Sequence, residues 1–148
     1  MIRTLQRRDL DRVMEIWVQS NLQAHYFIDS NYWLAQKVAV RKMIPQAEVY
    51  VAQVGEEVQG FIGVDGDTIE GIFVDIRYQG TGIGHQLITA VKEKHAVLYL
   101  QVYKKNKRAV IFYEREGFSV IEEQNDSATN EQEFTMQWSA PEKKAKNE

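Results

Sequence analysis

The first 45 residues combine one short predicted strand with two stretches of helical periodicity. Residues 2–5 form the strand. Asp9 is the candidate N-cap of the first helix. Its apolar positions recur at i, i+3, i+6 and i+7, namely Leu10, Val13, Ile16 and Trp17. Ser30 or Asn31 is expected to cap the second helix, which must end near Pro45 because proline cannot continue a helix.

At residue 48 the apolar period changes to two, which predicts three antiparallel strands. They run over residues 48–54, 58–64 and 68–74. The dipeptide Gly55-Glu56 closes the first hairpin, and the turn Asp65-Gly66-Asp67 closes the second. The third strand leads into three glycines at alternate positions, Gly80, Gly82 and Gly84.

The rest of the chain alternates helices and strands. A helix of about four turns runs from the glycines to the neighbourhood of His95, and the β-branched and aromatic run 97–103 is typical of a central strand. Asn106 is the expected N-cap of a further helix, which Gly117 closes. The last two strands are predicted at residues 118–121 and 133–138, joined by the polar loop 122–132.

This order predicts an α/β fold, β-α-α-β-β-β-α-β-α-β-β, with one mixed sheet and helices on both faces. The two strands around the glycine-turn helix should be parallel because a crossover helix joins them. We expect a single domain over residues 1–138. Residues 139–148 form a charged tail that is expected to be disordered because it has no apolar face to bury.

The composition narrows the possible functions. The chain has 148 residues, of which 44% are hydrophobic and 26% charged, as in ordinary soluble domains. A net charge of −3 gives no overall basic field, so neither nucleic acid nor a membrane is an expected partner. The lack of cysteine excludes disulfides and cysteine nucleophiles. With three scattered histidines and no long apolar run, we expect a cytoplasmic protein without a metal.

The glycine turn is a candidate anion site. A strand that delivers such a turn to a helix N-terminus presents unpaired backbone N–H groups, which suit a phosphate. The GxGxG spacing differs from the GxGxxG fingerprint of dinucleotide-binding domains. Gly84 is followed by His85, whereas a nucleotide P-loop has Lys and Ser or Thr there. What remains is Gln79-x-x-Gly82-x-Gly84, followed about 22 residues later by Asn106-x-x-Ala109-x-x-Phe112-Tyr113-x-x-x-Gly117-Phe118.

These two motifs, in this order and separation, resemble the acetyl-CoA signature of the GNAT superfamily, the GCN5-related N-acetyltransferases. The resemblance covers roughly residues 1–138. The patch His25-x-Phe27-Ile28 and the run Leu-x-Val-Tyr-x-x-Asn from Leu100 are similar to small bacterial acetyltransferases of the YiaC/YjaB type. The resemblance implies direct transfer of acetyl from acetyl-CoA to a primary amine in a ternary complex.

Two points stay open at this stage. The acceptor is either a protein amine (a lysine or an N-terminus) or a small amine, and a homodimer is one assembly to consider. A non-catalytic regulator that binds acyl-CoA with the same fold is the alternative function.

The resemblance also places the cofactor. The backbone N–H groups of residues 80–85 would bind the pyrophosphate. The pantetheine arm would lie along the strand at residues 72–74. There this strand would diverge from the neighbouring strand at residues 100–103, and we call this divergence the splay. A basic cluster beside Asn106 could meet the 3′-phosphate: Lys104, Lys105, Lys107 and Arg108. The expected cofactor-binding residues are Ile72, Phe73, Val74, Gln79, Gly80, Thr81, Gly82, Ile83, Gly84, His85, Asn106, Ala109 and Tyr113.

Acetyl transfer needs a neutral amine, a stabilised oxyanion and a proton for the departing thiolate. Tyr113 matches the family's general acid, and a phenol has a pKa about one to two units above that of a thiol. A backbone N–H near Phe73 or Val74 would stabilise the oxyanion.

The general base is not fixed by the sequence. Gln101 stands where related ribosomal-protein acetyltransferases carry a glutamate, and glutamine can position a water or the amine but cannot take a proton. Glu70 is another candidate, because alternation puts it on one face with Ile72 and Val74. His25 is a third candidate, and direct loss of the proton to water is the fourth.

The acceptor pocket is expected at an aromatic patch between the two N-terminal helices. Its candidate walls are His25, Phe27, Tyr32 and Trp33. Crowded aromatic side chains also serve commonly as core, so core packing is the competing interpretation.

Overall fold

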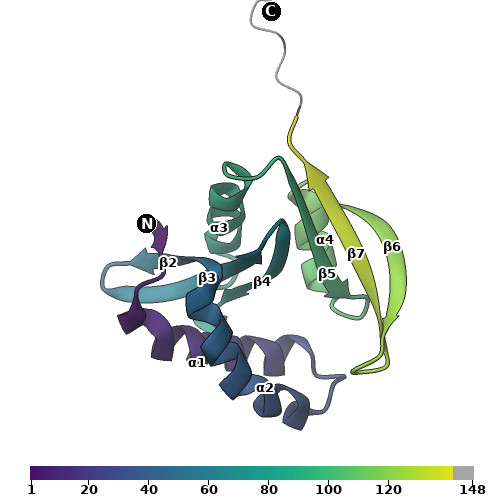
Figure 1. Ribbon diagram of the computed structural model, residues 1–148, viewed down its shortest axis with the longest axis horizontal. Helices are drawn as coiled ribbons and strands as arrows, with labels where there is room; N and C mark the ends of the chain where they lie inside the picture. The colour runs from purple at the N-terminus through teal and green to yellow at the C-terminus, as the bar shows by residue number, and fades with distance from the viewer. Residues whose placement is uncertain (142–148) are drawn as a thin grey trace, which may run out of the picture.

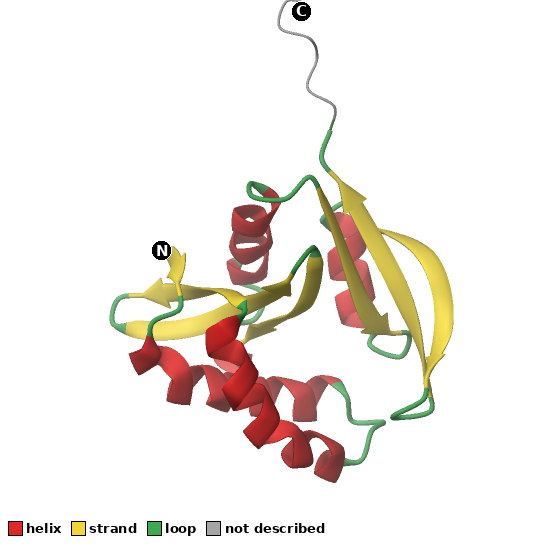
Figure 2. Cartoon of the chain, in the orientation of Figure 1, coloured by secondary structure: helices red, strands yellow, loops and turns green. Residues whose placement is uncertain are grey.

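The computed structural model describes residues 1–141 and has the element order expected from the sequence (Figures 1 and 2). The described strands form one seven-stranded mixed sheet in the order β1-β2-β3-β4-β5-β7-β6. The strands are β1 (Ile2–Thr4), β2 (Glu48–Val54), β3 (Glu57–Asp65), β4 (Thr68–Val74), β5 (Val97–Tyr103), β6 (Ser119–Asp126) and β7 (Glu131–Ser139). The helices are α1 (Leu10–Ala24), α2 (Ser30–Met43), α3 (Ile83–Lys92) and α4 (Lys107–Arg115).

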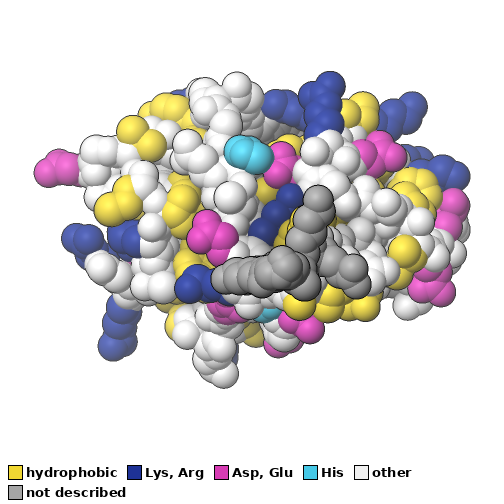
Figure 3. All heavy atoms as spheres, turned by 90° about the horizontal axis from the view of Figure 1, so that it is seen from above, with side chains coloured by type: hydrophobic (Ala, Val, Ile, Leu, Met, Phe, Trp, Pro, Cys, Tyr) yellow, Lys and Arg dark blue, Asp and Glu magenta, His cyan; other side chains and the backbone are white. Residues whose placement is uncertain are grey.

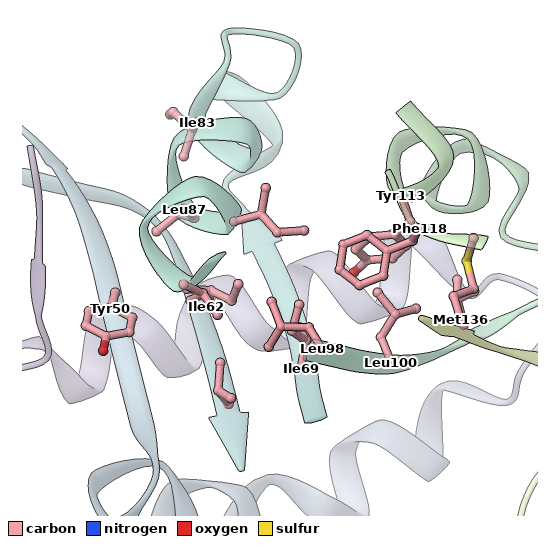
Figure 4. Packing of buried hydrophobic residues seen from close by; sticks show 14 of the residues in the cluster. Tyr50, Ile62, Ile69, Ile83, Leu87, Leu98, Leu100, Tyr113, Phe118 and Met136 are labelled. Carbon is pink, nitrogen blue, oxygen red and sulfur yellow. The ribbon is translucent and has the colours of Figure 1, made fainter. Parts of the chain in front are cut away.

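Helices cover both faces of the sheet, as predicted. In Figure 1, α1 and α2 lie along one face, and α3 and α4 lie on the other. One buried cluster packs α1 and α2 against the sheet, around Val13, Trp17, Val51 and Phe61. The second packs α3 and α4 on the opposite face, where Tyr113 and Phe118 lie beside Leu100 and Met136 (Figure 4). The cofactor site predicted from the sequence lies where α3 and α4 meet β4 and β5.

The parallel strands β4 and β5 separate along their length, which confirms the predicted splay. They pair only at Thr68 with Tyr99 and at Ile69 with Leu100. Beyond Ile69, β4 and β5 diverge, and Figure 1 shows the sheet opening into two arms there. Among the described residues, the backbone of 72–74 therefore does not pair with β5.

A β-bulge interrupts the alternation of side chains in β4 at Glu70. The register between β3 and β4 shifts between Gly63, which opposes Gly71, and Val64, which opposes Ile69. Glu70 is the extra residue of the bulge. Ile69 consequently packs in the same cluster as Ile72 and Val74, although strict alternation would put it on the other face. Ile69 thus breaks the strict alternation, and the alignment of Glu70 with Ile72 and Val74 stays a prediction.

Several predicted ends and caps also change. Asp29, rather than Ser30 or Asn31, caps α2, and its carboxylate accepts a hydrogen bond of 2.9 Å from the Asn31 N–H. Asp9 precedes α1 but does not cap it with its side chain, because its buried carboxylate forms a bidentate ion pair with Arg3. Helix α3 has ten residues, fewer than the predicted four turns.

The C-terminal hairpin is longer than predicted. Most of the predicted polar loop 122–132 belongs to β6 and β7, which leave only a short turn between them. The residues of β6 are largely exposed, so they carry no apolar alternation from which a strand could be recognised. β7 extends to Ser139, and the Ala140 N–H donates to the Ala96 carbonyl at 2.7 Å. Of the predicted disordered tail, residues 142–148 lie outside the described residues.

The described surface mixes charges of both signs. On the face seen in Figure 3, Lys and Arg side chains are interspersed with Asp and Glu, and hydrophobic atoms form small separate groups. Within residues 1–141, no helix is long and apolar enough to cross a membrane.

Candidate active site

The glycine turn forms an open cradle at the N-terminus of α3. Gly80 and Gly82 have φ of 79° and 91°, in the left-handed region that favours glycine. A Cβ atom at either position would meet no atom within 4 Å, so the requirement for glycine comes from the backbone alone. Gly82 is the N-cap of α3 and offers no side chain to cap it. The first N–H groups of the helix therefore point outward without intrahelical partners, as an anion site requires.

Gly84 is needed for a different reason, the close approach of α3 to α4. A Cβ atom there would lie 3.1 Å from Cζ of Phe112. This contact brings the cradle against the helix that carries Tyr113, so the two sequence motifs meet in space.

Gln79 connects the cradle to its surroundings. Its Nε2 atom donates to the Val74 carbonyl at 3.2 Å and to Oε1 of Gln23 at 3.3 Å. Its Oε1 atom accepts from Arg108 at 3.1 Å, which brings a cation from α4 beside the turn. Gln23, from the end of α1, is a contact that the sequence did not indicate.

Two lysines of the basic cluster, and His85, pair with carboxylates. Lys104 and Lys105 pair with Glu123 and Glu131 at 3.3 and 3.2 Å. The His85 ring contacts both carboxylate oxygens of Glu116 at 2.9 Å. Any contribution of His85 to the cradle would therefore come from its backbone N–H.

A buried carboxylate fixes the segment between β4 and the cradle. Asp75 is 2% exposed and accepts from the Arg77 N–H at 2.9 Å, from Arg77 Nη2 at 3.0 Å and from Arg12 Nη2 at 2.6 Å. The guanidinium groups of Arg77 and Arg12 hold the pKa of Asp75 well below its usual range. Because Arg12 belongs to α1, this network ties the start of the turn to the opposite helical layer.

Tyr113, the predicted general acid, lies in the second turn of α4. Its side chain is 8% exposed, and its ring packs edge-on against Phe112 and Phe118, with centroids 5.4 and 5.8 Å away. Figure 4 shows Tyr113 beside Phe118 and above Leu100 of β5. Burial raises the pKa of the phenol, so the hydroxyl stays protonated at neutral pH, as a proton donor must. The geometry thus combines core packing with a group suited to the proposed acid role.

The four aromatic residues predicted as acceptor walls do come together. The His25 ring stacks on Trp33 at 4.9 Å, and Phe27 and Tyr32 lie edge-on to His25 and Trp33. The fifth member, Tyr103 of β5, was missed by the sequence reasoning, and its ring lies 5.1 Å from His25. We call these five residues the aromatic cluster. Trp33 is buried, so part of the cluster is core.

His25 connects the aromatic cluster to Asn106, the N-cap of α4. Nε2 of His25 lies 3.3 Å from Nδ2 of Asn106, whose Oδ1 accepts from the Ala109 N–H at 3.4 Å as the cap of α4. Burial lowers the pKa of His25 to about 4. Such a weakly basic ring is a poor general base at neutral pH.

Glu70 and Gln101 flank the point where the splay opens. Each follows the last paired residue of its strand, Ile69 in β4 and Leu100 in β5, and both are exposed. Partial burial of its carboxyl group and the nearby charge of Asp65 raise the pKa of Glu70. Of the predicted base candidates, Glu70 alone combines a titratable carboxylate with this position.

The chain is similar in sequence to known acetyltransferases. Residues 20–139 match the family model described as the acetyltransferase (GNAT) domain. The peptidyl-lysine N-acetyltransferase YiaC of Escherichia coli strain K12 is 31% identical over 140 residues, which span 93% of this chain and 96% of YiaC. The peptidyl-lysine N-acetyltransferase YjaB of the same organism is 30% identical over 121 residues, or 80% of this chain and 82% of YjaB.

Solved structures show the same fold. The solution structure of apo YjaB from Escherichia coli superposes with a TM-score of 0.82 at 24% identity, covering 93% of this chain and 96% of that one. The structure of yncA from Salmonella typhimurium, which contains its cofactor acetyl-CoA, has a TM-score of 0.66 at 21% identity and covers 98% and 96%. The family match and the identity with YiaC go beyond fold. The chain belongs to the GNAT family and is an acetyl-CoA-dependent N-acetyltransferase.

Proposed function

We propose that this enzyme transfers acetyl from acetyl-CoA to the side-chain amine of a lysine in a peptide or protein. The observation that carries the proposal is the match to YiaC, a peptidyl-lysine N-acetyltransferase, over 96% of that protein's length. The open splay supports it, because a long lysine side chain could approach between the exposed Glu70 and Gln101.

The described residues fit the cofactor. The outward N–H groups at residues 80–85 suit a pyrophosphate, with Arg108 as a nearby cation. The edge of β4 at residues 72–73, which does not pair with β5 among the described residues, suits the amides of the pantetheine arm. A backbone N–H near Phe73 or Val74 would stabilise the oxyanion.

The chemistry then needs two proton movements. The amine nitrogen forms an amide bond to the acetyl carbon, the carbon–sulfur bond breaks, and the thiolate takes its proton from Tyr113. Glu70 receives the amine's proton, directly or through a water that Gln101 holds. The raised pKa of Glu70 makes it a better base than an ordinary carboxylate.

A thiol-release assay with a panel of amines tests this function. We expect turnover with lysine-containing peptides and an acetylated lysine in the product by mass spectrometry. Tyr113→Phe should lower kcat by roughly a hundredfold or more while acetyl-CoA still binds. Tyr26→Phe, which removes the hydroxyl of an exposed tyrosine, is the matched control and should retain most of the activity.

Two outcomes would contradict the proposal. Turnover of free polyamines alone would move the acceptor to small amines. Tight acetyl-CoA binding without thiol release from any amine would favour the acyl-CoA-binding regulator.

A further inference from the structure

The hydrogen bond between His25 and Asn106 joins two parts of the site that lie 81 residues apart. Asn106 uses Oδ1 to accept from the Ala109 N–H, so its NH₂ group faces the histidine. An amide NH₂ group can only donate. Nε2 of His25 must therefore accept, which places the ring proton on Nδ1.

The ring of His25 is held on several sides. Trp33 stacks on it at 4.9 Å, and Tyr103 and Phe27 lie edge-on at 5.1 and 5.9 Å. Its Nδ1 atom is buried without a hydrogen-bond partner among the described residues. The stack fixes the plane of the ring, and the hydrogen bond to Asn106 distinguishes Nε2 from the carbon that a half-turn of the ring would put in its place.

The charged groups around the cluster do not contact the histidine directly. Lys105 Nζ lies 5.6 Å from the centre of the Phe27 ring and is paired with Glu131. Asp126 accepts from the Tyr103 hydroxyl at 2.7 Å. His25 is consequently neutral at physiological pH, because burial opposes its protonation.

Asn106 sets the position of the first turn of α4. Its side chain caps the helix, and Tyr113 lies seven residues further on. A shift of this cap would move the start of the helix that carries the proposed acid. Positioning errors of about 1 Å cost roughly a hundredfold in rate in well-oriented active sites.

We propose that His25 is a positioning residue for acetyl transfer, which holds Asn106, and through it the first turn of α4, against the aromatic cluster. The acceptor side of the site and the acid-bearing helix are thereby fixed relative to each other. This inference rests on the role of Tyr113 in the proposed function.

Steady-state kinetics of three variants test the proposal. His25→Phe keeps a stacking ring but removes the acceptor nitrogen, and should lower kcat roughly tenfold, the equivalent of one hydrogen bond, with the Kd for acetyl-CoA within about twofold of wild type. His25→Gln supplies an acceptor oxygen and should recover most of the lost rate. In a Tyr113→Phe background, His25→Phe should have little further effect, because the positioned group is gone.

Two kinetic results would overturn it. One is a wild-type kcat for His25→Phe. The other is a full tenfold loss that persists in the Tyr113→Phe background, which would mean that His25 acts independently of α4. If Tyr113→Phe itself retains the wild-type rate, Tyr113 is not the general acid. That result would contradict the proposed function but not the hydrogen bond between His25 and Asn106.

Nitrogen NMR of the wild-type ring tests the hydrogen bond separately, without any variant that must fold. We expect a neutral ring protonated on Nδ1 from about pH 8 to about pH 5. In Asn106→Asp, a carboxylate oxygen would face Nε2 and should move the proton to that nitrogen. A wild-type ring protonated on Nε2 would refute the link.

Discussion

Asp75 shows how one buried side chain can fix a functional loop. Its carboxylate receives bonds from Arg12 of α1 and from Arg77 just before the glycine turn. The geometry of the cradle therefore depends on a residue outside both sequence motifs. Substitutions of Asp75 should therefore affect both the stability of the fold and cofactor binding.

Asp75→Asn should destabilise the fold by about 2 kcal/mol, less than the roughly 3–5 kcal/mol for breaking fully buried pairs because Arg12 keeps some contact with water. The pKa of Asp75 is lowered by its cations, so its contribution is present above the unfolded pKa, near 4, and is lost as the pH falls through the folded value. Urea unfolding between about pH 7 and about pH 3 measures both effects. Glu15→Gln, which removes an exposed partner of Arg12, should change stability by less than about 0.5 kcal/mol.

His95 gives the opposite pH dependence. Its Nδ1 lies 2.9 Å from Asp67 and its Nε2 lies 3.0 Å from Glu48, and these carboxylates raise its pKa. The stabilisation is therefore complete below the unfolded pKa, about 6.5, and is lost as the pH rises through the raised folded value. The free energy of unfolding should fall between about pH 6 and about pH 9, and His95→Gln should flatten this slope. An unchanged slope in the variant would show that other groups cause it.

At the scale of elements, the cradle depends on backbone conformation more than on packing. Gly82 needs a positive φ, yet a methyl group there would meet open space. A side chain at position 82 would therefore strain the backbone of the turn without a steric clash. Any loss of cofactor binding in such a variant would result from a change in the conformation of the turn.

Gly82→Ala should cost roughly 1–2 kcal/mol of stability from the left-handed backbone and should weaken acetyl-CoA binding measured by calorimetry. Gly55→Ala is a matched control, because Gly55 also has a positive φ of 62° and open space around it, in the β2–β3 turn. It should lose similar stability with unchanged cofactor affinity. Equal affinities in both variants would show that the cradle tolerates the change.

The order of the elements was predictable because apolar periodicity is local in the sequence. The bulge at Glu70 was not, since a register shift depends on the partner strand as well as on its own residues. The start of β6 was predicted as the strand 118–121, but its extension to Asp126 was not, because the exposed residues there show no apolar alternation.

The candidate site also has a part that was predictable from the sequence and a part that was not. Both halves of the cofactor motif are short contiguous patterns, so the glycine turn and the cap at Asn106 were found from the sequence. Gln23, Arg12 and Tyr103 act through contacts with residues far along the chain. Their residue types are common, and spacing gave no signal for them.

At the scale of the whole molecule, cofactor binding should stabilise the folded state by mass action. Coenzyme A at a hundred times its Kd should add about 2.7 kcal/mol to the free energy of unfolding. ATP or NAD at the same concentration should add much less, because the glycine spacing matches neither nucleotide motif. Thermal unfolding with each ligand measures this, and equal shifts for all three would argue against a site selective for coenzyme A.

The small overlap of β4 and β5 has a consequence for hydrogen exchange. Two residue pairs join the sheet's halves by backbone pairing, and one buried cluster packs side chains of both halves together. Without a ligand, the backbone amides along the separated edges of β4 and β5 should therefore exchange faster than those of the paired strands. An extended ligand bound in the splay would bridge these edges. The amides that line both edges should then exchange hydrogen together and slowly.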